Sequence, residues 1–410
     1  MTDHLAVVDL GYGDAGKGTV VEAICAAEQV TAVIRFNGGA QAAHNVVTEN
    51  GRHHTFAQFG SGTLRGVPTH LSRFVVVDPL ALAAEAAALG NPFHLLTIDE
   101  GALLATPWHR AANRARERRR GADRHGSCGL GIGQTMEYAL SNADAPRAAD
   151  ALSPARLRTR LALVRDRLTE SYGPLDAPPL DDVVAAFLAF GRAVSIVDQS
   201  RLDRLLAAGR CVFEGAQGVL LDEWRGWHPY TTWSTTTFDN VTALCSSFAR
   251  LGVVRTYTTR HGAGPLVTAA PLDLPEAHNG TAEWQGAFRV GHFDAVAHRY
   301  AIEVAGGVDG LAVTHLDVPP RVPELRVCTS YEVDGLRWER ISPGPFRDLG
   351  YQAGLTALLS RARPGTLERP QDWPSTIADL LGTRILVESH GPRSTDKRLA
   401  LPEGARPRRR

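Results

Sequence analysis

The sequence has no excess of either charge sign. Its 410 residues contain 44 Lys and Arg against 44 Asp and Glu, which gives a formal net charge of +0. Without a bulk electrostatic field, we expect neither nucleic acid nor an anionic membrane as a partner. Any phosphate that the protein binds must therefore be held by a local site.

Long apolar runs and cysteine pairs are also missing. No run approaches the roughly 20 apolar residues of a membrane-spanning helix, and the start MTDHLAVVDL lacks the features of a signal peptide. The cysteines never form a CxxC pair, which argues against a disulfide framework or a zinc site. We expect a cytoplasmic protein with reduced thiols. The five cysteines are Cys25, Cys128, Cys211, Cys245 and Cys328.

Short apolar runs alternate with helical stretches along the whole chain. The run 5–10, a glycine-rich turn, a helix at 20–30 and the run 31–36 predict a βαβ unit whose parallel strands are neighbours. The pattern predicts an α/β fold, with a large, mostly parallel central sheet, helices on both faces, a P-loop-like phosphate turn and helical subdomain insertions. Further strands are expected at 73–78, 211–216, 251–258, 310–317 and 384–389, and helices at 79–89, 199–209, 293–306 and 372–382.

No linker composition interrupts residues 1–400, so we expect a single domain there. The end of the chain, 401–410, contains the run RPRRR and is expected to be a disordered basic tail. A second basic segment, RARERRRG at 114–121, is interpreted as the solvated face of a helix.

The strongest local motif is GYGDAGKGT at 11–19, between a predicted strand and a predicted helix. Backbone N–H groups at a helix N-terminus surround phosphate oxygens, and Lys17 adds a positive charge. The usual GxxxxGK[ST] pattern is broken by Gly18, which displaces the hydroxyl to Thr19. Asp14 is unusual beside phosphates, and it suggests a bridging divalent cation or a base. The expected phosphate-binding residues are Gly13, Gly16, Lys17, Gly18 and Thr19.

A second cluster, RFNGGAQAAHN at 35–45, places His44 after a bend rich in glycine and alanine. In this order GDAGKG and GGAQAAH resemble the opening of adenylosuccinate synthetases, which read GDEGKG and GGHNAGH. Three more collinear blocks extend the resemblance. They are GSCGLGIG at 126–133 (family GTTGRGIGP), FEGAQG, LLD and PYTT within 213–232 (FEGAQG, LLD, PYVT), and YTTRHGAGP at 257–265 (YTTRVGAGP).

This resemblance implies a GTP-dependent ligase with Mg²⁺ as cofactor. Asp14 would remove the proton from purine N1 and bind magnesium, together with the backbone carbonyl of Ala43. His44 would be the acid that assists transfer of the γ-phosphoryl group to O6. The chemistry requires such a pair, because a purine oxygen is a poor leaving group until it is phosphorylated, and a positioned acid and base contribute about 10²–10⁴-fold.

The resemblance also implies a purine nucleotide site and a guanine reader. Asp317, in the sequence THLD at 314–317, matches the family's TKLD, although His315 replaces the lysine. The segment SHGP, with Ser389 and Gly391, resembles the second guanine-contacting segment STGP, so GTP is favoured over ATP. The purine nucleotide residues are Gln41 near the purine oxygen, Cys128 in place of a threonine, Gln217 facing the base, and Thr232 at the nucleotide phosphate.

The amine-donor loop departs from the family pattern. Adenylosuccinate synthetases hold aspartate with GxTTGRRRR, whereas the stretch 280–291 retains Thr281 and a single arginine, Arg289. Losing charged hydrogen bonds worth about 1.5–3 kcal/mol each weakens a dicarboxylate site, unless Arg260 or Arg35 compensates. The family also borrows an arginine from a neighbouring subunit, for which Arg147 is the nearest cation here, so a homodimer is implied.

Three hypotheses remain open. The first is a ligase that joins aspartate to IMP at the expense of GTP and yields adenylosuccinate. The second keeps this chemistry with a different purine nucleotide or amine donor. The third is a GTP-binding regulatory protein without catalysis, against which the retention of both Asp14 and His44 argues.

Overall fold

The computed structural model describes residues 4–276 and 283–401. Within these ranges a ten-stranded sheet runs through the molecule, and its strands pair in parallel except at one edge, where β22 is antiparallel to β21. The predicted α/β class with a large, mostly parallel sheet is confirmed. In spatial order the strands are β22 (Lys397–Leu399), β21 (Ile385–Ser389), β15 (Gly310–Thr314), β11 (Phe248–Arg255), β1 (His4–Asp9), β10 (Cys211–Gly218), β2 (Ala32–Arg35), β5 (Thr69–Leu71), β7 (Leu96–Asp99) and β9 (Ser195–Val197).

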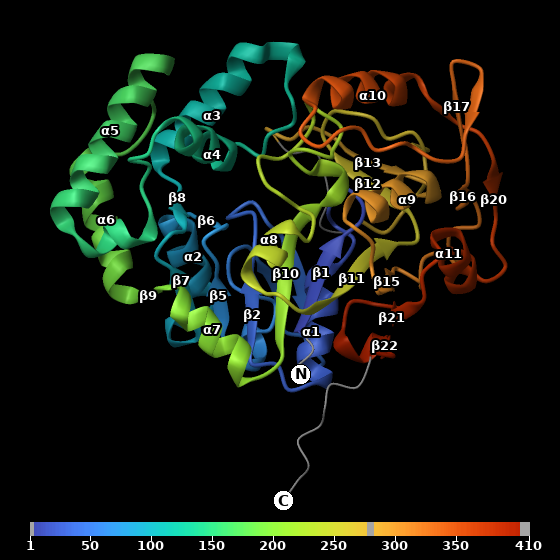
Figure 1. The fold of residues 1–410 in the computed structure, drawn as a ribbon, viewed down its shortest axis with the longest axis horizontal. Helices are drawn as coiled ribbons and strands as arrows, with labels where there is room; N and C mark the ends of the chain where they lie inside the picture. The colour runs from blue at the N-terminus through green and yellow to red at the C-terminus, as the bar shows by residue number, and fades with distance from the viewer. Residues whose placement is uncertain (1–3, 277–282, 402–410) are drawn as a thin grey trace, which may run out of the picture.

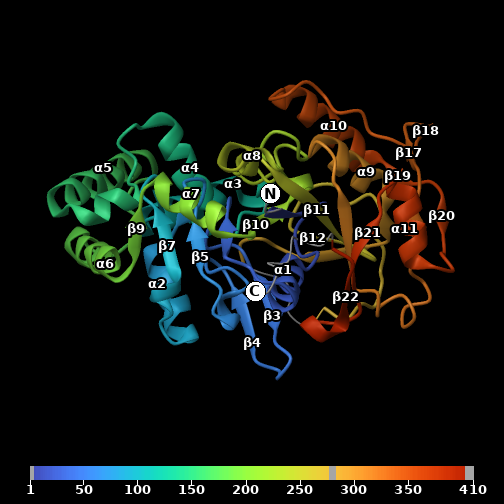
Figure 2. The same ribbon diagram turned by 60° about the horizontal axis from the view of Figure 1, so that its bottom comes forward.

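Helices lie on both faces of the sheet and gather at its two ends. Figures 1 and 2 show α5 and α6 beyond β7 and β9, and α10 and α11 at the opposite end. The helices are α1 (Lys17–Ala27), α2 (Pro79–Leu89), α3 (Pro107–Arg120), α4 (Ile132–Ser141), α5 (Pro154–Tyr172), α6 (Leu180–Ala193), α7 (Gln199–Ala208), α8 (Asp239–Leu244), α9 (Ala295–Val304), α10 (Leu349–Arg361) and α11 (Trp373–Leu381).

The central strand β1 shows why the sheet needs helices on both faces. Successive side chains of a strand point to opposite sides, and here both sides are apolar. Leu5 and Val7 pack with residues of α1, whereas Ala6 and Val8 join the core that includes α7, α8 and α9. All four side chains are buried. The run LAVV therefore forms a strand that is covered on both faces.

The strands β1 and β2 are parallel but are not neighbours. β10 lies between them, so the expectation of adjacent strands in the first βαβ unit was wrong. Glu214 of β10 pairs with Val7 on one side and with Arg35 on the other. Strand β10, which lies about 200 residues further along the chain, thus places a carboxylate between the two opening motifs.

Two predicted strands are shorter than expected. In the run 73–78 only β6 (Val76–Val77) is extended, and it pairs with β8 (Leu103–Leu104) outside the large sheet, because a turn from Ser72 to Val75 precedes it. The run 310–317 ends as a strand at Thr314, and His315 follows with a φ of 58° in the left-handed region. Asp317 therefore lies beyond the strand end.

Several small sheets of two or three strands lie outside the large one. They are β3 (His44–Val47) with β4 (His53–Phe56), β12 (Thr258–His261) with β13 (Phe288–Gly291), β14 (Phe293–Asp294) with β16 (Val327–Cys328) and β20 (Leu367–Glu368), and β17 (Tyr331–Val333) with β18 (Leu336–Trp338) and β19 (Arg363–Pro364).

Other expectations concern the surface and the ends of the chain. In the described ranges no helix is both long and apolar enough to span a membrane. All five cysteines are free, and four of them are buried. The segment 114–121 lies mostly in α3, as predicted. Residues 402–410 lie outside the described residues, so the predicted basic tail at 401–410 stays a prediction.

Candidate active site

The phosphate loop connects β1 to the N-terminus of α1, as the sequence predicts. Gly13 and Gly16 have φ angles of 93° and 92°, and Asp14 between them has 61°, so this turn requires the left-handed region three times. No side chain caps the start of α1. The first N–H groups of α1 therefore remain for a phosphate group, which is what a helix N-terminus offers to an anion.

Gly18, which breaks the usual phosphate-loop pattern, has a packing reason. A Cβ atom at this position would lie 2.6 Å from the Cβ of His44 and 3.1 Å from the Oγ of Ser61. The first turn of α1 thus lies directly against the backbone that carries His44. A serine or threonine at this position would push the two opening motifs apart.

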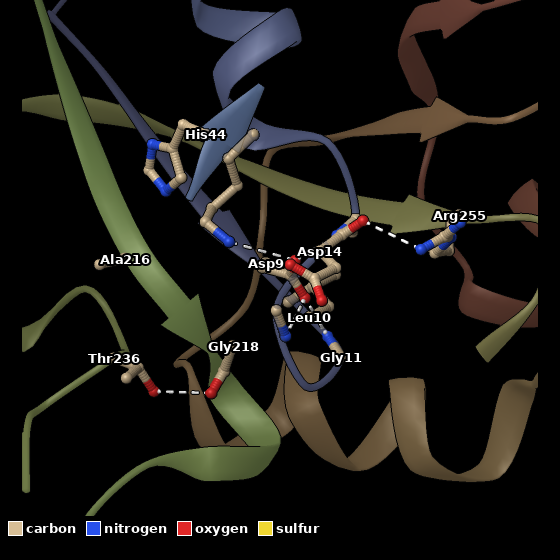
Figure 3. A network of polar contacts seen from close by, with 12 residues as sticks. Asp9, Leu10, Gly11, Asp14, His44, Ala216, Gly218, Thr236 and Arg255 are labelled. Atoms are coloured by element: carbon tan, nitrogen blue, oxygen red, sulfur yellow. Dashed lines mark hydrogen bonds and ion pairs between the residues drawn. The ribbon is translucent and has the colours of Figure 1, made fainter. Parts of the chain in front are cut away.

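Asp9, the last residue of β1, is a site residue that the sequence analysis missed. Its buried carboxylate accepts hydrogen bonds from the backbone N–H groups of Gly11 and Ala15, both at 2.8 Å, and from Lys17 Nζ at 3.2 Å. Figure 3 shows this carboxylate inside the loop. These hydrogen bonds fix the conformation of the loop from inside. The sequence signal that could have identified Asp9 was a carboxylate at the end of a buried strand, just before a glycine-rich turn.

The carboxylate of Asp14 is held by a histidine. Its Oδ2 lies 3.0 Å from Nε2 of His261, and its backbone carbonyl accepts a hydrogen bond from Nη1 of Arg255 at 3.2 Å. Burial alone would raise the pKa of Asp14, but the hydrogen bond and charge of His261, with the charges of Arg255 and Lys17, lower it. Asp14 is therefore ionised at neutral pH and able to accept a proton.

His44 is oriented by Glu214, a second residue that the sequence analysis did not assign. Nδ1 of His44 lies 2.6 Å from Oε1 of Glu214, and Glu214 also accepts hydrogen bonds from the backbone and hydroxyl of Ser61. Burial would raise the pKa of Glu214, but His44, Arg35 and Ser61 outweigh it and lower the pKa to about 2. An ionised Glu214 accepts a hydrogen bond from the Nδ1–H of His44, which leaves Nε2 of His44 for a substrate.

Asp14 and His44 share one site. The positive charge of Lys17 contributes to lowering the pKa of both, although burial dominates for His44. Figure 3 shows Asp14 beside Asp9 at the loop and His44 across from it, around the carboxyl end of β1. The structure thus brings together the two residues that the sequence assigned to acid and base roles.

Two glutamines converge next to this pair. The amide atoms of Gln41 and Oε1 of Gln217 are buried, and among the described residues they have no hydrogen-bond partner. Nε2 of Gln41 and Oε1 of Gln217 both lie within 4 Å of the position a Cβ of Gly38 would take. Buried polar groups are normally paired, so two converging amides indicate a place for a polar ligand or for water.

Cys128 and Thr232 lie on segments that contact each other. A Cβ at Gly133 would meet the ring of Trp233 at 2.8 Å, so the first turn of α4, which follows the loop of Cys128, packs against the segment of Thr232. Burial raises the pKa of the Cys128 thiol, so this side chain is neutral and supplies no charge to a phosphate. The binding roles of Cys128 and Thr232 stay predictions.

The two predicted guanine-reading segments are adjacent. The backbone N–H of Leu316 donates to Ser389 O at 3.0 Å, and the Ser389 hydroxyl donates to Gly391 O at 3.1 Å. Thr19 at the start of α1 donates its hydroxyl to Pro392 O at 2.7 Å. These contacts place both segments beside the phosphate loop. The carboxylate of Asp317 is ion-paired with Arg321 and remains about one-third exposed.

His315 is a packed residue with a φ of 58°. Its Nδ1 lies 2.9 Å from the hydroxyl oxygen of Thr314, and its ring lies edge-on to Tyr257. Burial holds its pKa well below the usual value, with help from Arg255 and Lys397, so the ring is neutral. His315 therefore does not replace the charge of the family's lysine.

In the amine-donor region, Thr281 lies outside the described residues. Nη2 of Arg289 donates to Gly262 O at 2.6 Å and to Gly264 O at 2.8 Å. The guanidinium of Arg260 is 2% exposed and donates to three backbone carbonyls, those of Ala263, Pro265 and Tyr230. The guanidinium of Arg260 is therefore occupied by backbone carbonyls, which does not favour it as the compensating cation.

Trp284 fills part of the space in the donor loop. The guanidinium carbons of Arg114, Arg118 and Arg124 lie 5.6, 5.3 and 5.6 Å from its ring centre. A Cβ on Gly129 would meet the same ring at 2.8 Å. The basic face of α3 thus packs on the donor loop, so the expectation that it is only a solvated face was incomplete.

A magnesium ion fits the donors present at the loop. No group of three or more His, Cys, Asp or Glu side chains in the described ranges could hold a metal by itself. Magnesium usually needs only one or two carboxylates when substrate phosphates supply further oxygens. Asp14 is partly exposed and Ala43 is an exposed residue, so both residues expected to hold the ion lie at the surface of the loop region.

The fold and site define an α/β protein in which a carboxylate and an imidazole lie beside a phosphate-loop-like turn. The sequence profile of the family "Adenylosuccinate synthetase" matches residues 6–350. The adenylosuccinate synthetase of Magnetococcus marinus is 32% identical over 88% of this chain and 85% of its own, and that of Acidithiobacillus ferrooxidans is 35% identical over 84% of both. The chain belongs to the adenylosuccinate synthetase family, and it is therefore a ligase that forms carbon–nitrogen bonds.

Solved structures show the same fold. The fully ligated adenylosuccinate synthetase of Plasmodium falciparum superimposes with a TM-score of 0.84 at 20% identity, covering 97% of this chain and 99% of its own. A succinoaminodeoxyadenylate synthetase of cyanophage S-2L, bound to dGMP and to dATP as energy donor, gives a TM-score of 0.63 at 20% identity and covers 98% and 96%.

Proposed function

We propose that this protein phosphorylates the 6-oxygen of a purine nucleotide with GTP and then replaces the phosphate by an amine. IMP is the default nucleotide and aspartate the default amine, which together give adenylosuccinate. The observation that carries the proposal is the pairing of an ionised Asp14 with a His44 held by Glu214 at one phosphate loop. The curated relatives with the same enzyme name support it.

The chain's own residues account for the proton movements. Asp14 takes the proton from N1, which places negative charge on O6 and makes that oxygen a nucleophile. O6 then bonds to the γ-phosphorus as the bond to the β-phosphate oxygen breaks, while Lys17 stabilises the charge on the transferred group. His44 does the same once its Nε2 carries a proton, which the negative charge of a bound triphosphate favours. The amine attacks C6, the C6–O bond breaks, and phosphate leaves as the amine loses a proton.

Magnesium would be held by the carboxylate of Asp14 and the carbonyl of Ala43, and it would offset charge on the triphosphate. GTP is supported by the position of Asp317 and of the Ser389 segment beside α1. The accessible edge of guanine offers two donors, and a carboxylate accepts from both. Gln41 and Gln217 would contact the acceptor purine, with Cys128 and Thr232 toward its phosphate.

A second candidate keeps the reaction and changes a substrate. It is favoured because Arg260 and Arg289 donate to backbone carbonyls and Trp284 occupies the donor loop, so the dicarboxylate of aspartate finds fewer free cations. The cyanophage synthetase, whose structure holds dGMP and dATP, shows that the fold accommodates other nucleotides. Under this candidate the amine or the purine differs from aspartate or IMP.

The two halves of the reaction are tested separately. GTP carrying ¹⁸O in the β,γ-bridge is incubated with Mg²⁺ and one of IMP, dIMP, GMP or dGMP, without an amine, and scrambling of the label reports phosphoryl transfer. Phosphate release with each amino acid then identifies the donor. Asp14→Asn should lower both signals by at least about 100-fold. Scrambling with none of the nucleotides, or an Asp14→Asn protein as active as the original, would refute the proposed phosphorylation of the purine by GTP.

Three further proposals accompany the function. We propose that residues 1–400 act as a single domain, that the enzyme is a homodimer, and that it works in the cytoplasm. The homodimer follows from the family's shared arginine, for which Arg147 is the candidate. In the structure Arg147 is exposed and its Nη1 donates to Gly101 O at 2.7 Å.

A further inference from the structure

His261 is the contact of Asp14 that the family pattern does not contain. The family motif reads YTTRVGAGP, with an apolar valine at the position where this chain has His261 in YTTRHGAGP. Nε2 of His261 lies 3.0 Å from Oδ2 of Asp14. Since an ionised carboxylate only accepts hydrogen bonds, Nε2 carries the hydrogen of this contact.

Two cations compete with His261 for the carboxylate of Asp14. Besides His261, the charges of Arg255 and Lys17 act on Asp14. Asp14 has a φ of 61°, and Arg255 holds its carbonyl, so the backbone is fixed and the side-chain torsions decide where the carboxylate points. Without His261 the carboxylate could turn toward Lys17 or Arg255 and lose its orientation toward a substrate.

The position of His261 is itself fixed by the donor region. His261 ends β12 and pairs with Phe288 of β13, and the two rings lie 4.8 Å apart. The N–H of the next residue, Gly262, donates to Ala287 O at 3.0 Å, and Arg289 donates to Gly262 O. The hairpin β12–β13 therefore holds the imidazole between the phosphate loop and the donor loop.

We propose that His261 is a positioning residue for the base: it holds Oδ2 of Asp14 by a hydrogen bond and so aims the other carboxylate oxygen at the purine. This inference rests on the proposed function, in which Asp14 is the base. It assigns a role to a position at which the family motif has a valine. The hydrogen bond links the rewritten donor loop to the catalytic carboxylate through the hairpin β12–β13.

Three substitutions separate the hydrogen bond from packing. His261→Val restores the family residue, His261→Phe keeps a ring against Phe288 without a donor, and His261→Gln keeps an N–H donor. The Val and Phe variants should lose at least about 10-fold in kcat with KM for GTP and for the purine nucleotide changed less than about threefold, because a misplaced group costs turnover. The Gln variant should recover a third or more of the original kcat, about a threefold loss at most.

The assay uses the full chain with GTP, Mg²⁺ and the nucleotide that supports ¹⁸O scrambling, with Tm measured for each variant. His94→Val, at an exposed histidine far along the chain, is the matched control and should behave like the original protein. An unchanged kcat in His261→Val or His261→Phe would overturn the proposal, as would an equal loss in His261→Gln. An active Asp14→Asn protein would instead overturn the proposed function, so the two failures are distinguishable.

Discussion

At the residue scale, the site depends on carboxylates that hold other side chains. Asp9 organises the phosphate loop, Glu214 orients His44, and Asp14 itself is held by His261. A charged hydrogen bond in a buried position is short, directional and stronger than a neutral one. Each functional group therefore has a fixed direction before any substrate arrives.

Glu214→Gln tests the orientation of His44. The amide keeps the shape but loses the charge that fixes the proton on Nδ1, so we expect kcat to fall by about 10- to 100-fold with little change in KM for GTP. Steady-state kinetics with the nucleotide found by ¹⁸O scrambling measure the effect. A variant with the original kcat would show that Glu214 only fills space.

Glu214 also predicts an acid limit of stability. Its pKa of about 2 lies below the ordinary value of 4.5, so the folded state gains stability above pH 4.5 and loses it as the pH falls toward 2. Urea unfolding of the original protein between pH 6 and 3 should show this loss. The Glu214→Gln variant should show a flatter dependence over the same range, and an identical slope in both proteins would contradict the assignment.

Asp317→Asn tests the choice of GTP. The amide replaces one acceptor with a donor, which opposes the donors of guanine, so KM for GTP should rise several-fold and KM for ATP should not. The pairing of Asp317 with Arg321 makes a control possible, since Arg321→Ala removes the exposed ion pair and leaves the carboxylate. Unchanged GTP kinetics in Asp317→Asn would remove this residue from the base site.

At the element scale, the active site forms where short elements touch. The first turn of α1 lies against β3 at Gly18, and β15 ends beside the phosphate loop, where the Thr314 hydroxyl donates to Ala15 O at 2.7 Å. The hairpin β12–β13 closes the other side through His261. Because each contact is between backbones or short side chains, small additions disturb the whole arrangement.

Gly18→Ala tests this close approach. The added Cβ would lie 2.6 Å from the Cβ of His44, so we expect a destabilisation of about 1–3 kcal/mol and a clear loss of kcat. Gly354→Ala is the matched control. It lies in α10 on the exposed side with no heavy atom near its Cβ, and it should raise stability by about 0.4–1 kcal/mol. Equal Tm values for the two variants would contradict the packing argument.

At the scale of the whole molecule, the sheet joins groups that are distant in sequence. The strand order places β10 between β1 and β2, and β11 and β15 on the other side of β1. Ligands of α/β sheets bind beyond the carboxyl ends of the strands. Most of the residues assigned to phosphate, purine and guanine binding come from such ends or from the segments that follow them, and Cys128, between α3 and α4, is the exception.

The homodimer is tested by subunit complementation. If Arg147 serves the site of a partner subunit, Arg147→Ala and Asp14→Asn proteins are each inactive, and heterodimers of the two have one intact site. A random mixture should then recover about a quarter of the original activity, since half of the dimers are mixed and each carries one complete site. A monomer by light scattering at micromolar concentration, or no recovery in the mixture, would refute the shared site.

The α/β class, the strand–loop–helix at 4–27 and the pair Asp14 and His44 could be predicted from the sequence. They depend on local patterns, namely apolar runs, glycines that allow left-handed backbone, and motifs with short spacing. The roles of Glu214 and His261 could not be predicted, because each role depends on which strands are neighbours in the folded protein. Glu214 and His261 both lie inside motifs that can be recognised in the sequence, but only the pairing of strands places them against His44 and Asp14.

The sequence by itself determined the family, the α/β class and the strand–loop–helix that carries the first motif, because motif residues and their neighbours along the chain are fixed by covalent order. Only the tertiary structure decided that Glu214 holds His44, that His261 holds Asp14, and that Trp284 packs against three arginines. Those contacts join residues that are far apart in sequence, 170 positions in the pair of His44 and Glu214. The packing of the whole sheet sets such contacts, and no local sequence pattern encodes them.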